Sequence, residues 1–245
     1  MQRATALLVV ILFSFSTSDE EPPSHPPTIL FVTGIPGAGK TTLVRNFVNE
    51  QPQLRAQSSP GGCAWLESED ANLLVLGKWS SFHDSDNDND DSSVLRYRPQ
   101  GDGTDRLGGP MPSPTLLRSC IDAIAILRAQ GKARLVIADG LLFLLASSSS
   151  FVDVLQEAPH GYRVLIRELD VDEDTAEARR EQRDGEHVAW VCDEACEIFF
   201  SALRARPQWE AVAEERMLPL MRRLAAEQLR QSAGDGECTA DAPAA

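Results

Sequence analysis

The sequence predicts an α/β domain in three layers, in which a mostly parallel sheet is covered by helices on both faces. Short apolar runs rich in β-branched residues alternate along the chain with segments whose apolar residues recur at helical spacing. The apolar runs lack polar alternation, as expected of parallel strands buried on both faces. Such alternation of strands and helices is typical of a parallel sheet with helices on both sides.

The individual elements follow from these patterns. Apolar runs predict four strands, at Thr28–Thr33, Cys63–Glu67, Ala133–Ala138 and Tyr162–Leu169. Apolar residues at helical spacing predict helices over Thr41–Asn49, Ser113–Gly131, Asp172–Arg183, Val188–Ala202 and Trp209–Leu229. Residues 77–112 are rich in Gly, Asp, Ser and Pro, so we expect a long loop there that includes both functional and disordered parts.

Domain boundaries follow from composition. Residues 19–27 are acidic and proline-rich, which predicts a linker, and we expect one folded domain over residues 28–231. Within it, residues 84–91 carry five aspartates and predict a mobile acidic insertion, for which a calcium loop is the less favoured interpretation. Residues 232–245 are small and polar and predict a disordered tail.

The first 18 residues have the layout of a secretory signal peptide. Arg3 supplies a positive charge, residues 4–15 are almost entirely apolar, and the small residues Ser16 and Ser18 follow. The apolar run is short for a membrane span. An uncleaved anchor and an extension that is never used as a signal are the alternatives. We expect the secretory pathway or an organelle if the segment acts as a signal, and the cytoplasm otherwise.

The net charge indicates which classes of partner to expect, and the cysteine spacing indicates the state of the thiols. The chain has 245 residues, 42% of them hydrophobic, and its 23 Lys and Arg against 37 Asp and Glu give a net charge of −14. Because nucleic-acid affinity is built from clustered positive charge, we expect no nucleic-acid partner. The five cysteines form no CxxC pair and are interpreted as mostly reduced thiols. Cys192 and Cys196 are interpreted as core residues, with a redox or metal pair as the alternative.

A glycine-rich octet lies between the first strand and the first helix. Residues Gly34–Thr41 fit the pattern GxxxxGK[ST] at every fixed position. In such a loop, backbone N–H groups and the positive end of the following helix surround a phosphate, the lysine neutralises the outer phosphates, and the hydroxyl holds Mg²⁺. We therefore expect ATP to contact Gly34, Ile35, Pro36, Gly37, Ala38, Gly39, Lys40, Thr41 and Thr42.

Asp139 is the predicted partner of Thr41 at the metal. It ends an apolar strand, so its carboxylate should emerge at the carboxyl edge of the sheet, beside the phosphates. The alternative is a plain turn at a strand end. Gly140 follows where hydrolytic ATPases often place Glu, which favours phosphoryl transfer to an acceptor other than water.

On these residues the chain resembles the P-loop NTPase superfamily, and within it the small P-loop kinases that act on nucleosides, nucleotides and metabolites. The resemblance covers residues 28–183. The chain has no NKxD segment and no LSGGQ-like stretch, which disfavours a GTPase and a transporter ATPase. The resemblance implies ATP and Mg²⁺ as cofactors and a small molecule as the second substrate.

The segment Arg163–Arg183 resembles the lid region of these kinases, in which a strand, an Asp-containing turn and an arginine-bearing helix follow one another. The resemblance implies catalytic roles for Arg179, Arg180 and Arg183, because lid arginines stabilise charge on the transferring phosphoryl group. An ordinary solvated helix with Glu and Arg pairs is the alternative.

Acidic residues after the second predicted strand are candidates for the acceptor side. A kinase needs a group that orients the attacking hydroxyl, and similar kinases often place it there. We therefore assign Asp70 a catalytic role and Glu67 a role in substrate binding, with surface acids as the alternative. Asp105 and Arg106 lie in a polar, glycine-rich segment that resembles loops of P-loop proteins, and they are further candidates for binding the acceptor.

The sequence therefore predicts a kinase that transfers the terminal phosphoryl group of ATP–Mg²⁺ to a small molecule. The rival hypothesis is a nucleotide-binding switch or weak NTPase that has no small-molecule acceptor.

Overall fold

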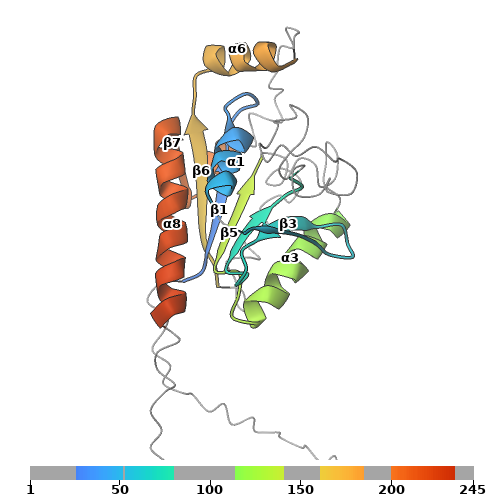
Figure 1. Ribbon diagram of the computed structural model, residues 1–245. Coiled ribbons are helices and arrows are strands. Elements are labelled where there is room, and N and C mark those ends of the chain that lie inside the picture. The colour runs from blue at the N-terminus through green and yellow to red at the C-terminus, as the bar shows by residue number, and fades with distance from the viewer. Residues whose placement is uncertain (1–25, 52, 80–113, 141–160, 185–199, 235–245) are drawn as a thin grey trace, which may run out of the picture.

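The computed structural model describes residues 26–51, 53–79, 114–140, 161–184 and 200–234. Within these residues, a seven-stranded sheet carries helices on both faces (Figure 1). The strands are β1 (Thr28–Thr33), β2 (Arg55–Ser58), β3 (Ala64–Glu67), β4 (Leu73–Leu76), β5 (Leu135–Asp139), β6 (Arg163–Asp170) and β7 (Trp209–Ala213). The helices are α1 (Lys40–Glu50), α3 (Pro114–Ala129), α6 (Glu173–Asp184) and α8 (Glu214–Gly234).

The sheet has the order β2-β3-β4-β5-β1-β6-β7. Strands β4, β5, β1, β6 and β7 are parallel, whereas β2 and β3 extend one side in antiparallel fashion. Central β1 pairs with β5 and β6, so that Val32 lies beside Asp139 and Thr33 beside Glu168. The carboxyl ends of β1, β5 and β6 therefore meet at one edge of the sheet.

The core has two layers because successive residues of a strand point to opposite faces. In β1, Ile29 and Phe31 pack in the cluster that contains α3, whereas Leu30 and Val32 pack in the cluster that contains α1 and α8. All six residues of β1 are buried. The structure thus confirms the predicted three-layer α/β fold with a mostly parallel sheet.

The secondary structure differs from expectation in three strands. Neither β2 nor β4 was predicted, because β2 is mostly exposed and β4 is a four-residue run. Residues 209–213 were predicted to be helical, but they form β7, whose ladder with β6 supplies backbone hydrogen bonds that local spacing does not reveal. Helix α8 begins only at Glu214 and continues to Gly234, past the expected start of the tail.

Cys63 and Cys120 are paired, whereas the five cysteines were interpreted as mostly reduced thiols. Cys63 precedes β3, Cys120 lies in α3, and a disulfide joins them across a Cα–Cα distance of 5.2 Å. The pairing escapes the sequence because 57 positions separate the two residues and packing alone brings them together.

Some predicted features lie outside the described residues. These are segment 1–18, the greater part of linker 19–27, insertion 84–91, residues 235–245 and the acceptor candidates Asp105 and Arg106. Of the predicted helix over 188–202, the structure describes residues 200–202, which are helical. None of the described helices combines the length and apolar character that a membrane crossing requires.

Candidate functional site

The phosphate-binding loop joins the carboxyl end of β1 to the start of α1. Helix α1 begins at Lys40, so its N-terminal end, which carries partial positive charge, faces the loop. Gly39 immediately precedes the helix in a left-handed conformation with φ of 91°, which a side chain disfavours. Within the loop, the Ala38 backbone N–H donates to the Ile35 carbonyl at 3.1 Å. The octet therefore forms the strand, loop and helix arrangement that its sequence predicts.

The Lys40 side chain folds back over its own loop. Its Nζ donates to the Gly34 carbonyl at 2.9 Å and to the Ile35 carbonyl at 3.1 Å. The ammonium is thus held against the backbone of the loop. A phosphate is a stronger partner for an ammonium than a neutral carbonyl, because charge-assisted hydrogen bonds are stronger.

Thr41 and Asp139 meet at the base of the loop. The Thr41 hydroxyl donates to Asp139 Oδ2 at 2.7 Å, although the two residues are 98 positions apart. Asp139 is only 2% exposed at the end of β5, next to Val32 of β1. A hydroxyl and a carboxylate are hard oxygen donors of the kind that Mg²⁺ prefers, so the pair fits this ion. Among the described residues no cluster of three or more His, Cys, Asp or Glu could hold a metal, so phosphate oxygens and water would complete the shell.

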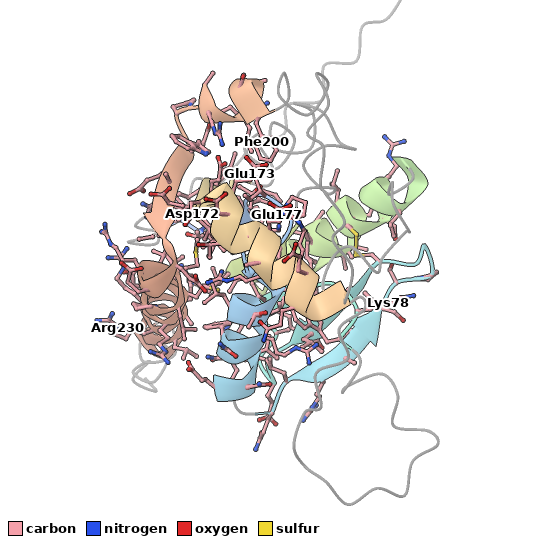
Figure 2. All side chains as sticks on the ribbon, turned by 90° about the horizontal axis from the view of Figure 1, so that it is seen from above. Lys78, Asp172, Glu173, Glu177, Phe200 and Arg230 are labelled. Atoms are coloured by element: carbon pink, nitrogen blue, oxygen red, sulfur yellow. A yellow bond between two sulfur atoms is a disulfide. The ribbon has the colours of Figure 1, made fainter. Side chains whose placement is uncertain are left out.

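Helix α6 lies across the carboxyl edge of the sheet, over the loop and the start of α1 (Figure 1). Asp172 begins it as an N-cap, because its carboxylate accepts hydrogen bonds from the Thr175 backbone N–H and hydroxyl, both at 2.8 Å. Those hydrogen bonds lower the pKa of Asp172. Figure 2 shows Asp172, Glu173 and Glu177 along α6. The buried residues Ala176 and Arg180 lie on the side of this helix that faces the loop.

The contact between α6 and the loop is very close. A Cβ atom at Gly37 would overlap the Ala176 carbonyl, and Gly37 also has a φ of 90°. Arg180 is 5% exposed, and its NH1 donates to the Pro36 carbonyl at 2.6 Å. Arg179 donates to the Ala38 carbonyl at 3.3 Å. Helix α6 therefore brings Arg179 and Arg180 to the backbone of the phosphate-binding loop.

The three predicted lid arginines differ in their surroundings. The guanidinium of Arg180 donates a hydrogen bond to the loop backbone, and this contact ties α6 to the loop. Arg179 is partly exposed and also pairs with Glu214 at 2.8 Å. Arg183 lies in α6, but its side chain is outside the described part. Contact with a transferring phosphoryl group stays a prediction for all three.

Glu214 is a residue of the site that sequence reasoning missed. It is the first residue of α8, and its Oε1 lies 3.5 Å from where a Cβ of Gly39 would stand. Its Oε2 accepts from Arg179. Residues 209–229 were expected to form one helix, which placed Glu214 inside a helix rather than at its start. The strand β7 brings Glu214 to the same edge of the sheet as the loop.

The predicted roles of Asp70 and Glu67 conflict with the topology. We expected β3 to end at the carboxyl edge, but β3 is antiparallel to β4, and β4 is parallel to β5. Glu67 and Asp70 therefore lie at the opposite edge of the sheet from the loop. Asp70 instead organises the turn between β3 and β4, where it accepts from Ser68 and from the backbone and side chain of Asn72. Asp70 is thus not placed to act on an acceptor beside the phosphates.

The end of β4 occupies the position that we expected for Asp70. Because β4 is parallel to β5, the residues after Leu76 lie at the carboxyl edge, on the side of Asp139. Gly77 donates its N–H to the Ala64 carbonyl at 2.9 Å. Lys78 is exposed there (Figure 2), whereas Trp79 is 2% exposed in the α1 and α8 cluster. Sequence reasoning missed this placement because the short strand β4 was not recognised.

Comparison with known proteins assigns the chain to a family. The model of the AAA domain family matches residues 29–195, which include the loop, Asp139 and α6. Among solved structures, a gluconokinase from Sinorhizobium meliloti 1021 is similar at 13% identity and a TM-score of 0.34, with 86% of this chain and 96% of that chain covered. No curated protein matches the sequence.

The family assignment rests on the family model and on the observed fold. The family model covers more than half of the chain, and the matched region contains the phosphate-binding loop between β1 and α1 together with Asp139 at the end of β5. The chain therefore belongs to the AAA domain family of P-loop NTPases.

Proposed function

We propose that the protein transfers the terminal phosphoryl group of ATP–Mg²⁺ to a small-molecule acceptor. The observation that carries the proposal is the convergence of Lys40, the Thr41–Asp139 pair and α6 at one edge of the sheet. Positive charge, oxygen donors for a divalent cation and a covering helix are the parts that phosphoryl transfer requires. Open α/β sheets bind their ligands at this edge.

Each residue has a definite task in this proposal. Lys40 exchanges its bonds to the Gly34 and Ile35 carbonyls for bonds to the outer phosphate oxygens, and so stabilises the charge that develops there. Thr41 and Asp139 are the residues that would hold the metal. Bound Mg²⁺ would neutralise phosphate charge. Arg179 is partly exposed beside the loop and can turn from Glu214 toward the phosphates.

Gly140, the residue after Asp139, bears on whether the acceptor is water or an organic hydroxyl. The next residue, Gly140, has no side chain that could activate water, and its φ of 108° favours glycine. This supports transfer to an organic hydroxyl rather than hydrolysis. The space for such an acceptor is expected at the carboxyl ends of β4 and β5, near Lys78.

One observation favours the second candidate, a nucleotide-dependent switch. Helix α6 bonds directly to the backbone of the phosphate-binding loop through Arg179 and Arg180. A nucleotide that changes the loop would therefore shift α6, and the first turn of α6 carries the acidic residues Glu173 and Asp174, which a partner could contact.

Nucleotide consumption separates the two candidates. ATP turnover is measured with the full chain, alone and with a panel of sugar acids, sugars, nucleosides and polyols, with Lys40→Ala as the control for contaminating activity. A kinase is expected to accelerate about 100-fold or more with one acceptor class, and phosphorylated product should appear in step with ADP. A slow rate that no acceptor changes would favour the switch.

A further inference from the structure

The disulfide between Cys63 and Cys120 lies in the core rather than at the site of chemistry. Both residues are 0% exposed, and they pack in the same cluster as Phe31, Leu116 and Ile124. Their Cα–Cα distance of 5.2 Å lies within the range that a disulfide spans without backbone movement. Catalytic disulfides are accessible to a second thiol, whereas this bond is enclosed, which indicates a structural role.

Contacts between the residues around Cys63 and those around Cys120 keep the two ends of the disulfide close together. Ser59 donates its backbone N–H to the Cys63 carbonyl at 2.7 Å, and the Ser59 hydroxyl accepts from the Cys63 N–H at 3.2 Å. The same hydroxyl lies 2.6 Å from that of Ser119, the neighbour of Cys120. A Cβ atom at Gly61 would overlap the Ser119 side chain. The β2–β3 turn and α3 are therefore in close contact beside the disulfide.

The cross-link joins one edge region of the sheet to α3. Strand β2 is an edge strand with mostly exposed residues, and β2 and β3 join the parallel sheet only through β4. The disulfide adds a covalent connection from the start of β3 to α3, and it closes a segment of 57 positions. A disulfide that closes a long segment strongly restricts the unfolded chain, so this bond should contribute much of the stability of this region.

A second and independent observation comes from the N-terminal sequence. Residues 1–18 carry a positive charge, an apolar run and then small residues, which is the layout of a secretory signal peptide. Structural disulfides form and persist in oxidising compartments and are rare where thiols are kept reduced. The N-terminal pattern and the enclosed disulfide therefore point to the same environment.

We propose that the N-terminal segment directs the protein into an oxidising compartment and that Cys63 and Cys120 are oxidised there to a structural disulfide. The two thiols together lose two protons and two electrons, which pass to a disulfide of the glutathione or thiol-oxidoreductase class and reduce it to two thiols. The proposal does not depend on phosphoryl transfer, because neither the bond nor the segment belongs to the nucleotide site.

The bond is tested on the purified full chain in a glutathione buffer poised at a secretory redox potential. After denaturation and alkylation, peptide mapping should recover the Cys63–Cys120 cross-linked peptide, and dithiothreitol should lower the Tm by about 10 °C. The double variant C63S/C120S should have the Tm of the reduced wild-type chain both with and without dithiothreitol. The control C238S should respond to dithiothreitol as the wild-type chain does. Alkylated Cys63 and Cys120 in a natively folded protein would overturn the proposal.

The compartment is tested by translating the full chain in vitro with microsomes. The chain should become protected from added protease, and a variant with Leu7→Arg and Leu8→Arg should remain digestible because charges interrupt the apolar run. Peptide mapping of the protected chain should recover the cross-link. A wild-type chain that stays as digestible as the variant would overturn the proposal, whatever its ATP turnover.

Discussion

Lys40 is the residue on which phosphoryl transfer should depend most strongly. Its ammonium is held by two loop carbonyls, and these neutral partners can be exchanged for phosphate oxygens. Lys40→Ala should lower ATP turnover by about 100-fold or more, since the charge acts where negative charge develops. The Tm without nucleotide should stay close to that of the wild type. Turnover that survives in a folded Lys40→Ala protein would remove Lys40 from the chemistry.

Asp139 should control the requirement for magnesium. Asp139→Asn keeps the size of the side chain and its contact with Thr41 but removes the negative charge. The Mg²⁺ concentration for half-maximal activity should rise about 10-fold or more, whereas nucleotide binding in EDTA should persist. A titration of activity with Mg²⁺ measures this effect. Thr41→Ser keeps the hydroxyl and serves as the control. An unchanged Mg²⁺ titration in Asp139→Asn would mean that Asp139 ends a strand and has no role at the metal.

At the scale of elements, the β3–β4 turn depends on Asp70. Burial by itself raises the pKa of this carboxyl, but hydrogen bonds from Ser68 and Asn72 outweigh burial and lower it below its ordinary value. A lowered folded-state pKa means that the carboxylate stabilises the fold above the unfolded pKa, about 3.9, and that this stability is lost as the pH falls further.

Asp70→Ala should therefore be less stable than the wild type at pH 7, and the difference should narrow below about pH 4. Urea unfolding at both pH values measures the free energy of unfolding. ATP turnover should be unchanged, because Asp70 lies at the edge of the sheet opposite the loop. Glu69→Gln removes only an exposed ion pair with Arg55 and serves as the control. A large loss of turnover in Asp70→Ala would contradict the placement of Asp70.

The attachment of α6 to the loop depends on Arg180. Its buried guanidinium donates to the Pro36 carbonyl, so Arg180→Met leaves that acceptor without a partner. We expect a loss of about 2 kcal/mol in the free energy of unfolding and a higher KM for ATP. Arg222→Met, which breaks an exposed pair between α8 and Glu50, should change neither quantity appreciably. Equal effects of the two substitutions would argue against a specific role for Arg180.

Nucleotide should stabilise the whole molecule, because it binds the folded chain and not the unfolded chain. ATP–Mg²⁺ at about 100 times its Kd should raise the Tm by about 5–10 °C. The loop, α1, α6 and the start of α8 meet at one edge of the sheet, so the effect should extend across these elements (Figure 1). In Lys40→Ala the shift at the same nucleotide concentration should be smaller. The absence of any shift in the wild type would contradict nucleotide binding.

Local patterns were sufficient for the centre of the fold. The β1 strand, the octet and α1 are contiguous, so their structure depends on residues a few positions apart. The pairing of Thr41 with Asp139 was also predictable, because parallel strands that flank each other end at the same edge. The N-cap at Asp172 and the end of the β5 strand followed from the same short-range rules.

The three-layer fold, the phosphate-binding loop and the place of Asp139 beside it could be predicted from local sequence patterns. The direction of β3, which carries Asp70 away from the loop, and the position of Glu214 beside Gly39 could not, because they depend on how the chain packs. Only the tertiary structure paired Cys63 with Cys120. The physical reason is that strand direction at a sheet edge and contacts between distant residues depend on how the whole chain packs, whereas helical spacing and loop glycines act within a few residues.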